Sequence, residues 1–289
     1  MLFGFLNIYK PKGITSHDVV AKIRRAGGIR QIGHSGTLDP MAEGVLPVAV
    51  GKAARLIEFL DEGKTYIAQM EFGKVSDTYD IEGALKEYSS KKVLKEEVLN
   101  GLQQFSGKIE QIPPAYSAVH YKGKRLYELA RQGIVPDDIP KRTVFVNKIE
   151  LLDFDFEKQT AKIEIDCSKG TYIRSIVHDL GLALGSGAVM TTLIRTRCGK
   201  FRFADAVPVD AFVDKSDVES NLINPVDVLS YNCYNLSEFE FQKVKHGQPL
   251  KTKQFEEDEY ICLVYQDELC AVAKKGGKDI LVTKKVFVP

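Results

Sequence analysis

Residues 33–40 read GHSGTLDP, and the apolar run VLPVAV follows at residues 45–50. The glycines permit tight turns and close backbone approach, and the residue before a proline is biased towards an extended conformation. This pattern predicts a stiff loop that holds one carboxylate, Asp39, at the mouth of a buried strand. A lone Asp-Pro pair usually only starts a turn, so the prediction depends on the whole string.

On both sides of this loop, hydrophobic periodicity predicts short strands that alternate with helices. Apolar residues recur at helical spacing in four segments, which are expected at about 15–28, 52–60, 94–105 and 173–184. Apolar and polar residues alternate in two others, the half-buried strands expected at 66–72 and 161–167. The predicted fold class is α+β, with a mixed, mainly antiparallel sheet flanked by helices.

A polar segment at residues 216–231 contains Asn224-Pro225 and predicts a domain boundary. The first domain is expected to cover residues 1–231. The second, residues 232–289, carries short apolar runs separated by turn residues, which predicts a small β-rich domain.

Composition limits the possible functions. The 289 residues are 44% hydrophobic and 27% charged, with a net charge of only +1. Nucleic-acid binding would therefore need local basic clusters. One such cluster interleaves cations with tyrosines, a pattern suited to phosphates and bases, although charge runs are usually solvated faces; it comprises Lys122, Lys124, Arg125, Arg131, Lys141 and Arg142 with Tyr116, Tyr121 and Tyr127.

The sequence predicts no signal peptide, no membrane span, no metal site and no phosphate loop. Residues 1–6 lack a basic n-region and are expected to form a first strand rather than a signal peptide, and no later segment is expected to span a membrane. The five cysteines and five histidines show no metal-ligand spacing, so reduced cysteines, no metal and a cytoplasmic location are expected. The sequence GKT at residues 63–65 is no phosphate loop, because Glu58 stands where its first glycine is required.

Five segments occur in the order found in one known family. The chain resembles the bacterial tRNA pseudouridine-55 synthases in YKPKGITS (9–16), GHSGTLDP (33–40), KTY (64–66), IPPAYSA with KRLY (112–118 and 124–127) and KGTYIRS (169–175). The resemblance implies a pseudouridine synthase fold for residues 1–231, with an RNA-gripping insertion at about 112–142. HGQPL at residues 246–250 resembles an RNA-binding PUA domain, which implies a PUA-like domain at 232–289.

The resemblance also implies three catalytic residues. Asp39 is expected to act as the nucleophile, a role that suits an ionised carboxylate. Arg174 is its expected partner, because a nearby guanidinium keeps a carboxylate charged. Tyr66 is expected to stack on a flipped-out uridine and to take part in proton abstraction. Without the resemblance, the three residues would be read as a turn aspartate, a surface arginine and a core tyrosine.

Six further residues are expected to bind the substrate. His34 and Tyr172 are placed near the flipped base, and Lys10 is expected to brace the floor of the pocket. Lys124, Arg125 and Arg131 belong to the insertion, which is expected to act as a movable flap. In LIRTRCG (193–199) the family's double arginine is interrupted by Ile194, and Arg195 and Arg197 remain candidates for RNA contact.

The implied activity is the conversion of uridine to pseudouridine at position 55, in the T-loop of tRNA, by base flipping and without a cofactor. The expected partner is the T-arm stem-loop, bound by a monomer that needs no other protein. Two alternatives remain open: a guide-RNA-dependent synthase acting on other RNAs, and an RNA-binding chaperone that folds tRNA. Whether Asp39 attacks C1′ or C6, or C2′ is deprotonated first, also remains open.

Overall fold

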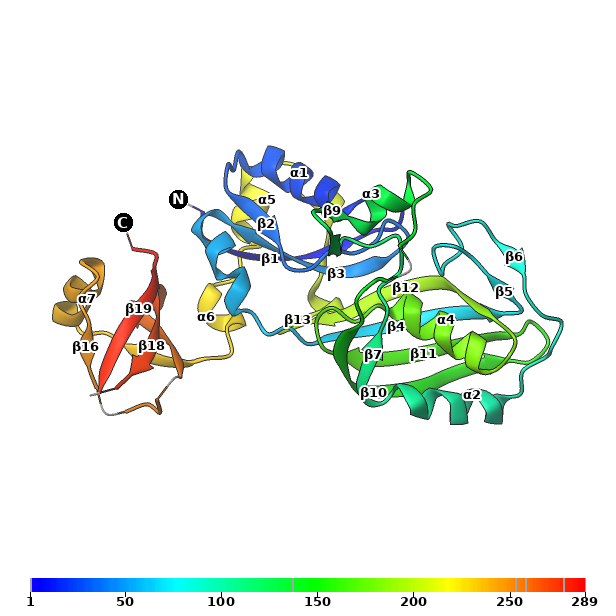
Figure 1. The fold of residues 1–289 in the computed structure, drawn as a ribbon. Helices are drawn as coiled ribbons and strands as arrows, with labels where there is room; N and C mark the ends of the chain where they lie inside the picture. Colours follow the sequence, from blue (N-terminus) through cyan, green and yellow to red (C-terminus); the bar gives the residue numbers. More distant parts are fainter. Residues whose placement is uncertain (1, 137, 253, 258, 278, 289) are drawn as a thin grey trace. The chain divides into compact units, whose positions relative to one another are not determined.

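The computed structural model describes residues 2–136, 138–252, 254–257, 259–277 and 279–288 (Figure 1). Its contacts divide the chain into two compact units, each of which brings together distant parts of the sequence. Unit 1 contains residues 1–39, 45–61 and 199–289, and unit 2 contains residues 40–44 and 62–198. The expected boundary between residues 231 and 232 stays a prediction.

Unit 2 is built on a sheet whose neighbouring strands are antiparallel. The strand order is β12 (Ala188–Cys198), β4 (Lys64–Phe72), β11 (Thr160–Cys167), β10 (Arg142–Asp155) and β7 (Gly107–Gln111). β12 also pairs in parallel with Glu43 and Gly44, the first residues of β3 (Glu43–Val50), so the sheet is mixed. These strands confirm the predicted fold class.

Two helices, α2 (Lys95–Leu102) and α4 (Ile173–Ala183), pack against this sheet and against each other. Every second side chain of β4, from Tyr66 to Phe72, is buried, while the residues between them are partly exposed. The helices approach closely where α2 carries Gly101, because a Cβ there would lie 2.7 Å from Leu180 Cδ1. The period-2 and helical patterns of the sequence are therefore confirmed in unit 2.

Shorter elements of unit 2 connect these layers. β5 (Lys74–Val75) pairs with β6 (Lys86–Glu87), and the helical turn η2 (Gln103–Phe105) follows α2. The hairpin of β8 (His120–Tyr121) and β9 (Lys124–Arg125) precedes α3 (Leu126–Ala130). Its two loop residues, Lys122 and Gly123, have φ angles of 47° and 87°, the left-handed pair that a tight hairpin of this kind requires.

In unit 1, β2 (Ile32–His34) pairs antiparallel with β3, and β1 (Gly4–Lys10) pairs in parallel with β14 (Val207–Pro208). The expected first strand thus starts at Gly4, and Met1 lies outside the described residues. α1 (Ser16–Gly27) begins with a capping box, in which the Asp18 amide donates to Thr15 Oγ1 and the Thr15 amide donates to Asp18 Oδ2. Such a box satisfies two amides that a helix start leaves open.

The helix expected at residues 52–60 is a 3-10 helix, η1 (Gly51–Phe59). Its buried apolar side chains, Ala53, Leu56 and Phe59, recur every third residue. This is the period of the 3-10 helix, whose side chains three residues apart line up on one face. The remaining short elements of unit 1 are β13 (Phe201–Arg202), η3 (Phe203–Asp205), η4 (Val209–Ala211), α5 (Lys215–Ser220) and α6 (Pro225–Val228).

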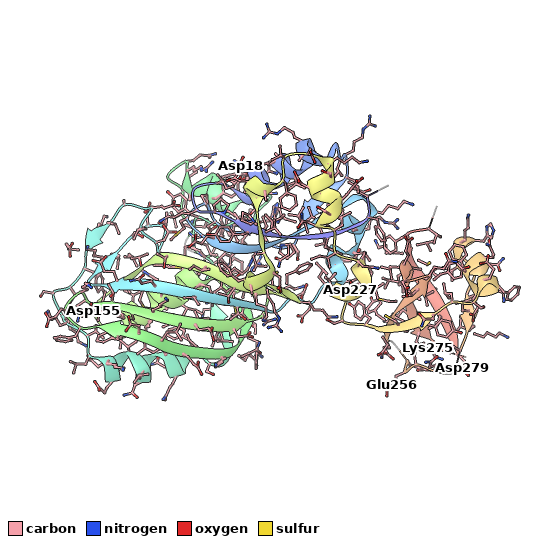
Figure 2. The ribbon with its side chains drawn as sticks, turned by 180° about the vertical axis from the view of Figure 1, so that it is seen from behind. Asp18, Asp155, Asp227, Glu256, Lys275 and Asp279 are labelled. Carbon is pink, nitrogen blue, oxygen red and sulfur yellow. The ribbon has the colours of Figure 1, made fainter. Side chains whose placement is uncertain are left out.

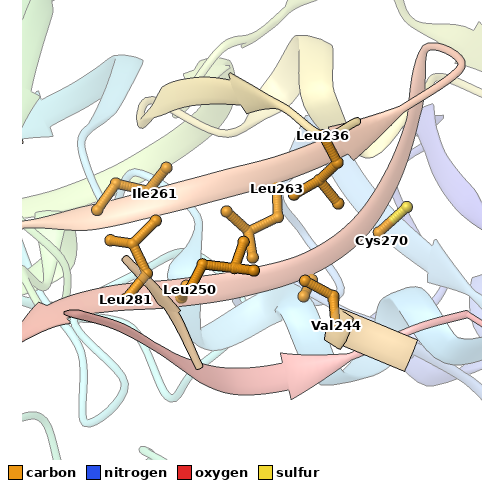
Figure 3. Packing of buried hydrophobic residues seen from close by; sticks show 9 residues of the cluster. Leu236, Val244, Leu250, Ile261, Leu263, Cys270 and Leu281 are labelled. Atoms are coloured by element: carbon orange, nitrogen blue, oxygen red, sulfur yellow. The ribbon is translucent and has the colours of Figure 1, made fainter. Parts of the chain in front are cut away.

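The C-terminal part of unit 1 is a five-stranded sheet, which confirms the predicted β-rich region. Its order is β15 (Asn232–Asn235), β17 (Tyr260–Tyr265), β18 (Glu268–Gly276), β19 (Ile280–Val286) and β16 (Leu250–Lys251). An unexpected helix, α7 (Glu238–Lys245), supplies Val244 to the core of this sheet, together with Leu236, Leu250 and Leu263, and Figure 3 shows Val244 beside Leu250 at the edge of the cluster. Lys275 is buried and donates to Asp279 Oδ1 (Figure 2), so its charge is paired.

Among the residues described, no helix is long and apolar enough to cross a membrane.

Candidate active site

The Asp39 loop of unit 1 is tied to the start of α1 at the residue before the aspartate. The Leu38 amide donates to Ser16 Oγ at 2.9 Å, and Ser16 Oγ donates to the Leu38 carbonyl at 3.1 Å. Both residues are buried, where such hydrogen bonds are costly to lose. Earlier in the loop, the Ser35 amide donates to the Pro47 carbonyl of β3. The loop is therefore anchored on both sides of Gly36, in agreement with the stiff loop that the sequence predicts. Asp39 in this loop is half-buried.

Two predicted binding residues also belong to unit 1. His34 ends β2 opposite Val48 and is half-buried. Lys10 ends β1 and is fully buried, with Nζ donating to the Pro11 carbonyl at 3.0 Å. Because a buried ammonium requires such partners, Lys10 is part of the framework of this unit rather than a mobile surface cation.

Arg174, in unit 2, is the second residue of α4 and is only 5% exposed. Its Nη1 donates to the Thr78 carbonyl at 3.0 Å and to Asp80 Oδ2 at 3.4 Å, and its Nη2 donates to the Tyr116 carbonyl at 3.0 Å. The guanidinium is thus fixed by two separate segments of the unit. The interpretation of Arg174 as an exposed surface arginine is wrong.

Asp80 is a candidate site residue that sequence reasoning missed. It is 3% exposed, and its Oδ1 accepts from Thr78 Oγ1 at 2.6 Å and from the Glu82 amide at 3.0 Å. These bonds leave Oδ2 directed at Arg174, in a buried ion pair. The only sequence signal is the run of hydroxyl and acidic residues SDTYD at 76–80, which ordinary turns also show.

The first turn of α4 also holds the segment that leads into the flap. Gln111 binds the backbone of Tyr172 twice, since its Oε1 accepts from the Tyr172 amide at 3.0 Å and its Nε2 donates to the Tyr172 carbonyl at 3.2 Å. Ser175 Oγ donates to the Ile112 carbonyl at 3.0 Å. Tyr172 is therefore held through its main chain beside Arg174, and its side chain is half-buried.

Tyr66 and Arg195 are direct neighbours across β4 and β12, and they are 7% and 0% exposed. Burial raises the pKa of the Tyr66 hydroxyl to about 12, and the hydrogen bond and charge of Arg195 oppose that rise. At neutral pH Tyr66 is therefore a neutral phenol. The buried Arg195 does not face solvent for RNA contact, so that expectation is corrected.

Arg197 lies on the other face of the sheet, because the register shifts between it and Arg195. Its Nη2 donates to Asp166 Oδ2 at 2.6 Å and its Nε donates to Thr65 Oγ1 at 3.0 Å. A single irregularity in β12 thus separates two arginines that the sequence places together.

The flap carries the remaining predicted binding residues, and Lys124, Arg125 and Arg131 are all exposed. The guanidinium of Arg131 lies over the Tyr127 ring at 5.4 Å. At the hairpin tip, Lys122 Nζ lies 4.7 Å from the Tyr121 ring centroid. This basic and aromatic surface is of the kind that meets phosphates and bases in RNA.

We expect Tyr66→Phe to reduce the alkaline loss of stability. The folded-state pKa of Tyr66, about 12, exceeds the ordinary value of 10.0, so the unfolded chain ionises first. The raised pKa therefore contributes up to about 3 kcal/mol to the free energy of unfolding. This contribution is fully present below pH 10 and is lost as the pH rises to 12. Urea unfolding at pH 8 and pH 11 measures this difference. The matched control is Tyr88→Phe at an exposed position, and equal alkaline losses in wild type and Tyr66→Phe would contradict the expectation.

Matches to two family models show that the chain is a pseudouridine synthase. The family model described as TruB family pseudouridylate synthase (N terminal domain) matches residues 24–173. The model for the tRNA pseudouridylate synthase B C-terminal domain matches residues 174–229. The chain belongs to the TruB family of pseudouridylate synthases, which confirms the resemblance found in the sequence.

Curated relatives cover most of the chain. It is 50% identical to the tRNA pseudouridine synthase B of Gloeobacter violaceus over 210 residues, which are 72% of each protein. It is 40% identical to that of Lactobacillus johnsonii over 290 aligned positions, which are 96% of each protein.

A solved structure shares the fold. The Cbf5 chain of a Cbf5-Nop10-Gar1 complex is 27% identical, with a TM-score of 0.71 over 99% of this chain and 85% of that one.

Proposed function

We propose that this chain converts uridine to pseudouridine at position 55, in the T-loop of tRNA. The observation that carries the proposal is the match to relatives named tRNA pseudouridine synthase B, which extends over 96% of both proteins. The anchored GHSGTLDP loop supports it, because a nucleophile must be held in a fixed geometry to react efficiently.

The reaction is an isomerisation, so no atom is gained or lost. The N1–C1′ bond breaks, the base turns, and C5 bonds to C1′ while the C5 proton goes to solvent and N1 is protonated. Asp39 supplies the carboxylate that forms a covalent bond with the uridine or stabilises the charge that develops as N1 leaves. An attack at C1′ or at C6, or an initial deprotonation of C2′, is compatible with this assignment.

Arg174 and Tyr66 have distinct proposed roles. Arg174 provides a fixed positive charge, which favours the ionised form of a carboxylate, and its pairing with Asp39 remains a prediction. Tyr66 provides an aromatic face for a flipped uridine, and stacking recovers part of the unstacking cost of a few kcal/mol. Its raised pKa supports stacking by the neutral phenol. Proton abstraction by Tyr66 would first require ionisation of the hydroxyl.

We further propose that the chain works in the cytoplasm, as a monomer that recognises the T-arm stem-loop without another protein or a guide RNA. The Cbf5 neighbours belong to complexes with Nop10 and Gar1, which keeps the guide-RNA-dependent alternative open. The extended match to tRNA pseudouridine synthase B sequences favours the stand-alone enzyme. A tRNA-folding chaperone remains the second alternative, and it would not need the chemistry of Asp39.

The test is tritium release from a tRNA transcript labelled at C5 of uridine, with purified protein and no guide RNA. One equivalent of tritium released per tRNA, with pseudouridine mapped to the T-loop, is the expected result. Tight binding of tRNA without release overturns the proposal and favours the chaperone. Release that appears only after a guide RNA and partner proteins are added favours the guided enzyme.

Removal of the positive charge of Arg131 in the flap is expected to weaken tRNA binding without slowing the chemical step. We expect Arg131→Gln to raise the Kd and to lower the slope of log Kd against log salt by about 0.7 to 1, the value of one phosphate contact. Filter binding between 50 and 300 mM salt measures the slope, with Lys158→Gln, in the exposed β10–β11 turn, as the matched control. An unchanged slope would show that Arg131 meets no phosphate.

A further inference from the structure

A ring stack connects the two elements of unit 2 that carry Asp80 and Arg174. The rings of Tyr79 and His178 are nearly parallel, with centroids 3.8 Å apart and an interplanar angle of 10°. Tyr79 directly precedes Asp80 in the loop, and His178 lies one helical turn after Arg174 in α4. The stack and the ion pair are therefore adjacent contacts between the same loop and the same helix.

We propose that the Tyr79–His178 stack positions the Asp80–Arg174 ion pair and thereby sets the rate of the chemical step. This inference rests on the proposed function, because Arg174 is the catalytic cation in it. His178 and Tyr79 act through their neighbours and are positioning residues.

The backbone of Tyr79 shows that this arrangement is imposed by its surroundings. Its φ angle is 66°, in the left-handed region that a bulky side chain rarely adopts. The Tyr79 amide donates to the Ser76 carbonyl, and the Tyr79 carbonyl accepts from the Met190 amide of β12. Such a conformation persists only where surrounding contacts determine it. The stack on His178 is a side-chain contact that holds this ring.

The ion pair is sensitive to small movements of the loop. Arg174 Nη1 is shared between the Thr78 carbonyl at 3.0 Å and Asp80 Oδ2 at 3.4 Å. The longer bond is near the limit for a hydrogen bond, so a shift of a few tenths of an ångström breaks it. Because Tyr79 directly precedes Asp80, a contact that fixes Tyr79 also limits the movement of the Asp80 carboxylate.

The shape of the His178 ring, rather than its charge, makes the contact. Burial lowers the pKa of His178, which keeps the imidazole neutral at pH 7. Asp179 is the next residue of α4 and its charge acts on Tyr79, while Asp77 and Lys86 line the same cavity as His178, of about 420 Å³. Within the described part of the chain, His178 Nδ1 is buried and has no hydrogen-bond partner. A phenylalanine ring can therefore replace the imidazole without losing a bond.

The experiment compares His178→Ala and His178→Phe in single-turnover tritium release with enzyme in excess over tRNA. We expect His178→Ala to slow release about 10- to 100-fold, the effect of a misplaced catalytic group, with the Kd for tRNA within about twofold of wild type. We expect His178→Phe to restore the rate to within about threefold, because the stack is kept. If His178 only stabilised the fold, the melting temperature and the rate of release would fall together in both variants, and that result would overturn the inference.

Combining His178→Ala with Asp80→Asn tests whether the Tyr79–His178 stack affects the reaction rate through Asp80. If the stack acts through Asp80, adding His178→Ala to Asp80→Asn slows release no further, since coupled residues are not additive. A further slowing equal to that in wild type overturns the inference, and so does wild-type activity in His178→Ala. Should His178→Ala fail to fold, His178→Leu takes its place, and wild-type release by that variant likewise overturns the inference. If wild-type protein releases no tritium, the proposed function falls and the inference falls with it.

Discussion

Asp39→Asn is expected to abolish pseudouridine formation while tRNA binding stays within about threefold of wild type. The amide has nearly the shape of the carboxylate but lacks its charge and its nucleophilic oxygen, and loss of a catalytic nucleophile costs about 10⁴-fold or more in rate. The loop should keep its conformation, because the substitution leaves its anchors intact: the two bonds between Ser16 and Leu38 and the bond from the Ser35 amide to the Pro47 carbonyl. The half-buried position of Asp39 gives the amide access to solvent, so folding should be preserved.

Two further variants make this result specific. Asp153→Asn, at an exposed position on β10, is the matched control and should retain full activity. Ser16→Ala leaves Asp39 in place but removes both hydrogen bonds to Leu38, so it should slow the reaction about 10- to 100-fold through loss of positioning. Substantial release of tritium by Asp39→Asn would rule out Asp39 as the nucleophile. Loss of tRNA binding in the same variant would assign Asp39 to recognition instead.

Much of the fold was predictable because its patterns are local. In β4 the alternation of Tyr66, Ala68, Met70 and Phe72 is set by one buried face, and the structure buries all four. The start of α1 follows from the hydroxyl of Thr15 and the carboxylate of Asp18, three residues apart. Such signals need no knowledge of distant parts of the chain.

Two helices of unit 1 were not fully described by the sequence patterns, because two periods are hard to tell apart over a short segment. In η1, spacings of three and of 3.6 residues barely differ over nine residues, so the 3-10 helix was predicted only as a helix. In α7 the sequence EFEF alternates like a strand, with Phe239 exposed and Phe241 partly buried. The capping box between Ser237 and Glu240 begins a helix there instead.

The residues of the candidate site were predictable only where they lie in sequence motifs that resemble those of the family. The pairing of Asp80 with Arg174 joins positions 94 residues apart, and no periodicity encodes such a contact. Arg195 and Arg197 lie on opposite faces of the sheet because of a register shift in β12. Tertiary packing decides both features, so a single sequence could not give them.

Arg174→Met is expected to lower the free energy of unfolding by about 3 to 5 kcal/mol, because it leaves the Asp80 carboxylate buried without its cation. Pseudouridine formation should be lost as well. Urea unfolding and single-turnover tritium release measure the two effects on the same protein.

Arg174→Met combined with Asp80→Leu separates the structural role of the guanidinium from its catalytic one. A well-packed apolar pair often replaces a buried ion pair at little cost, and the leucine no longer needs the cation at 3.4 Å. We therefore expect the double variant to regain most of the lost stability and to remain inactive. Stability would return because no buried charge is left unpaired, whereas activity would not, because the fixed positive charge at the start of α4 is still missing. If activity returned together with stability, Arg174 would serve only to neutralise Asp80, and another cation would have to support the reaction.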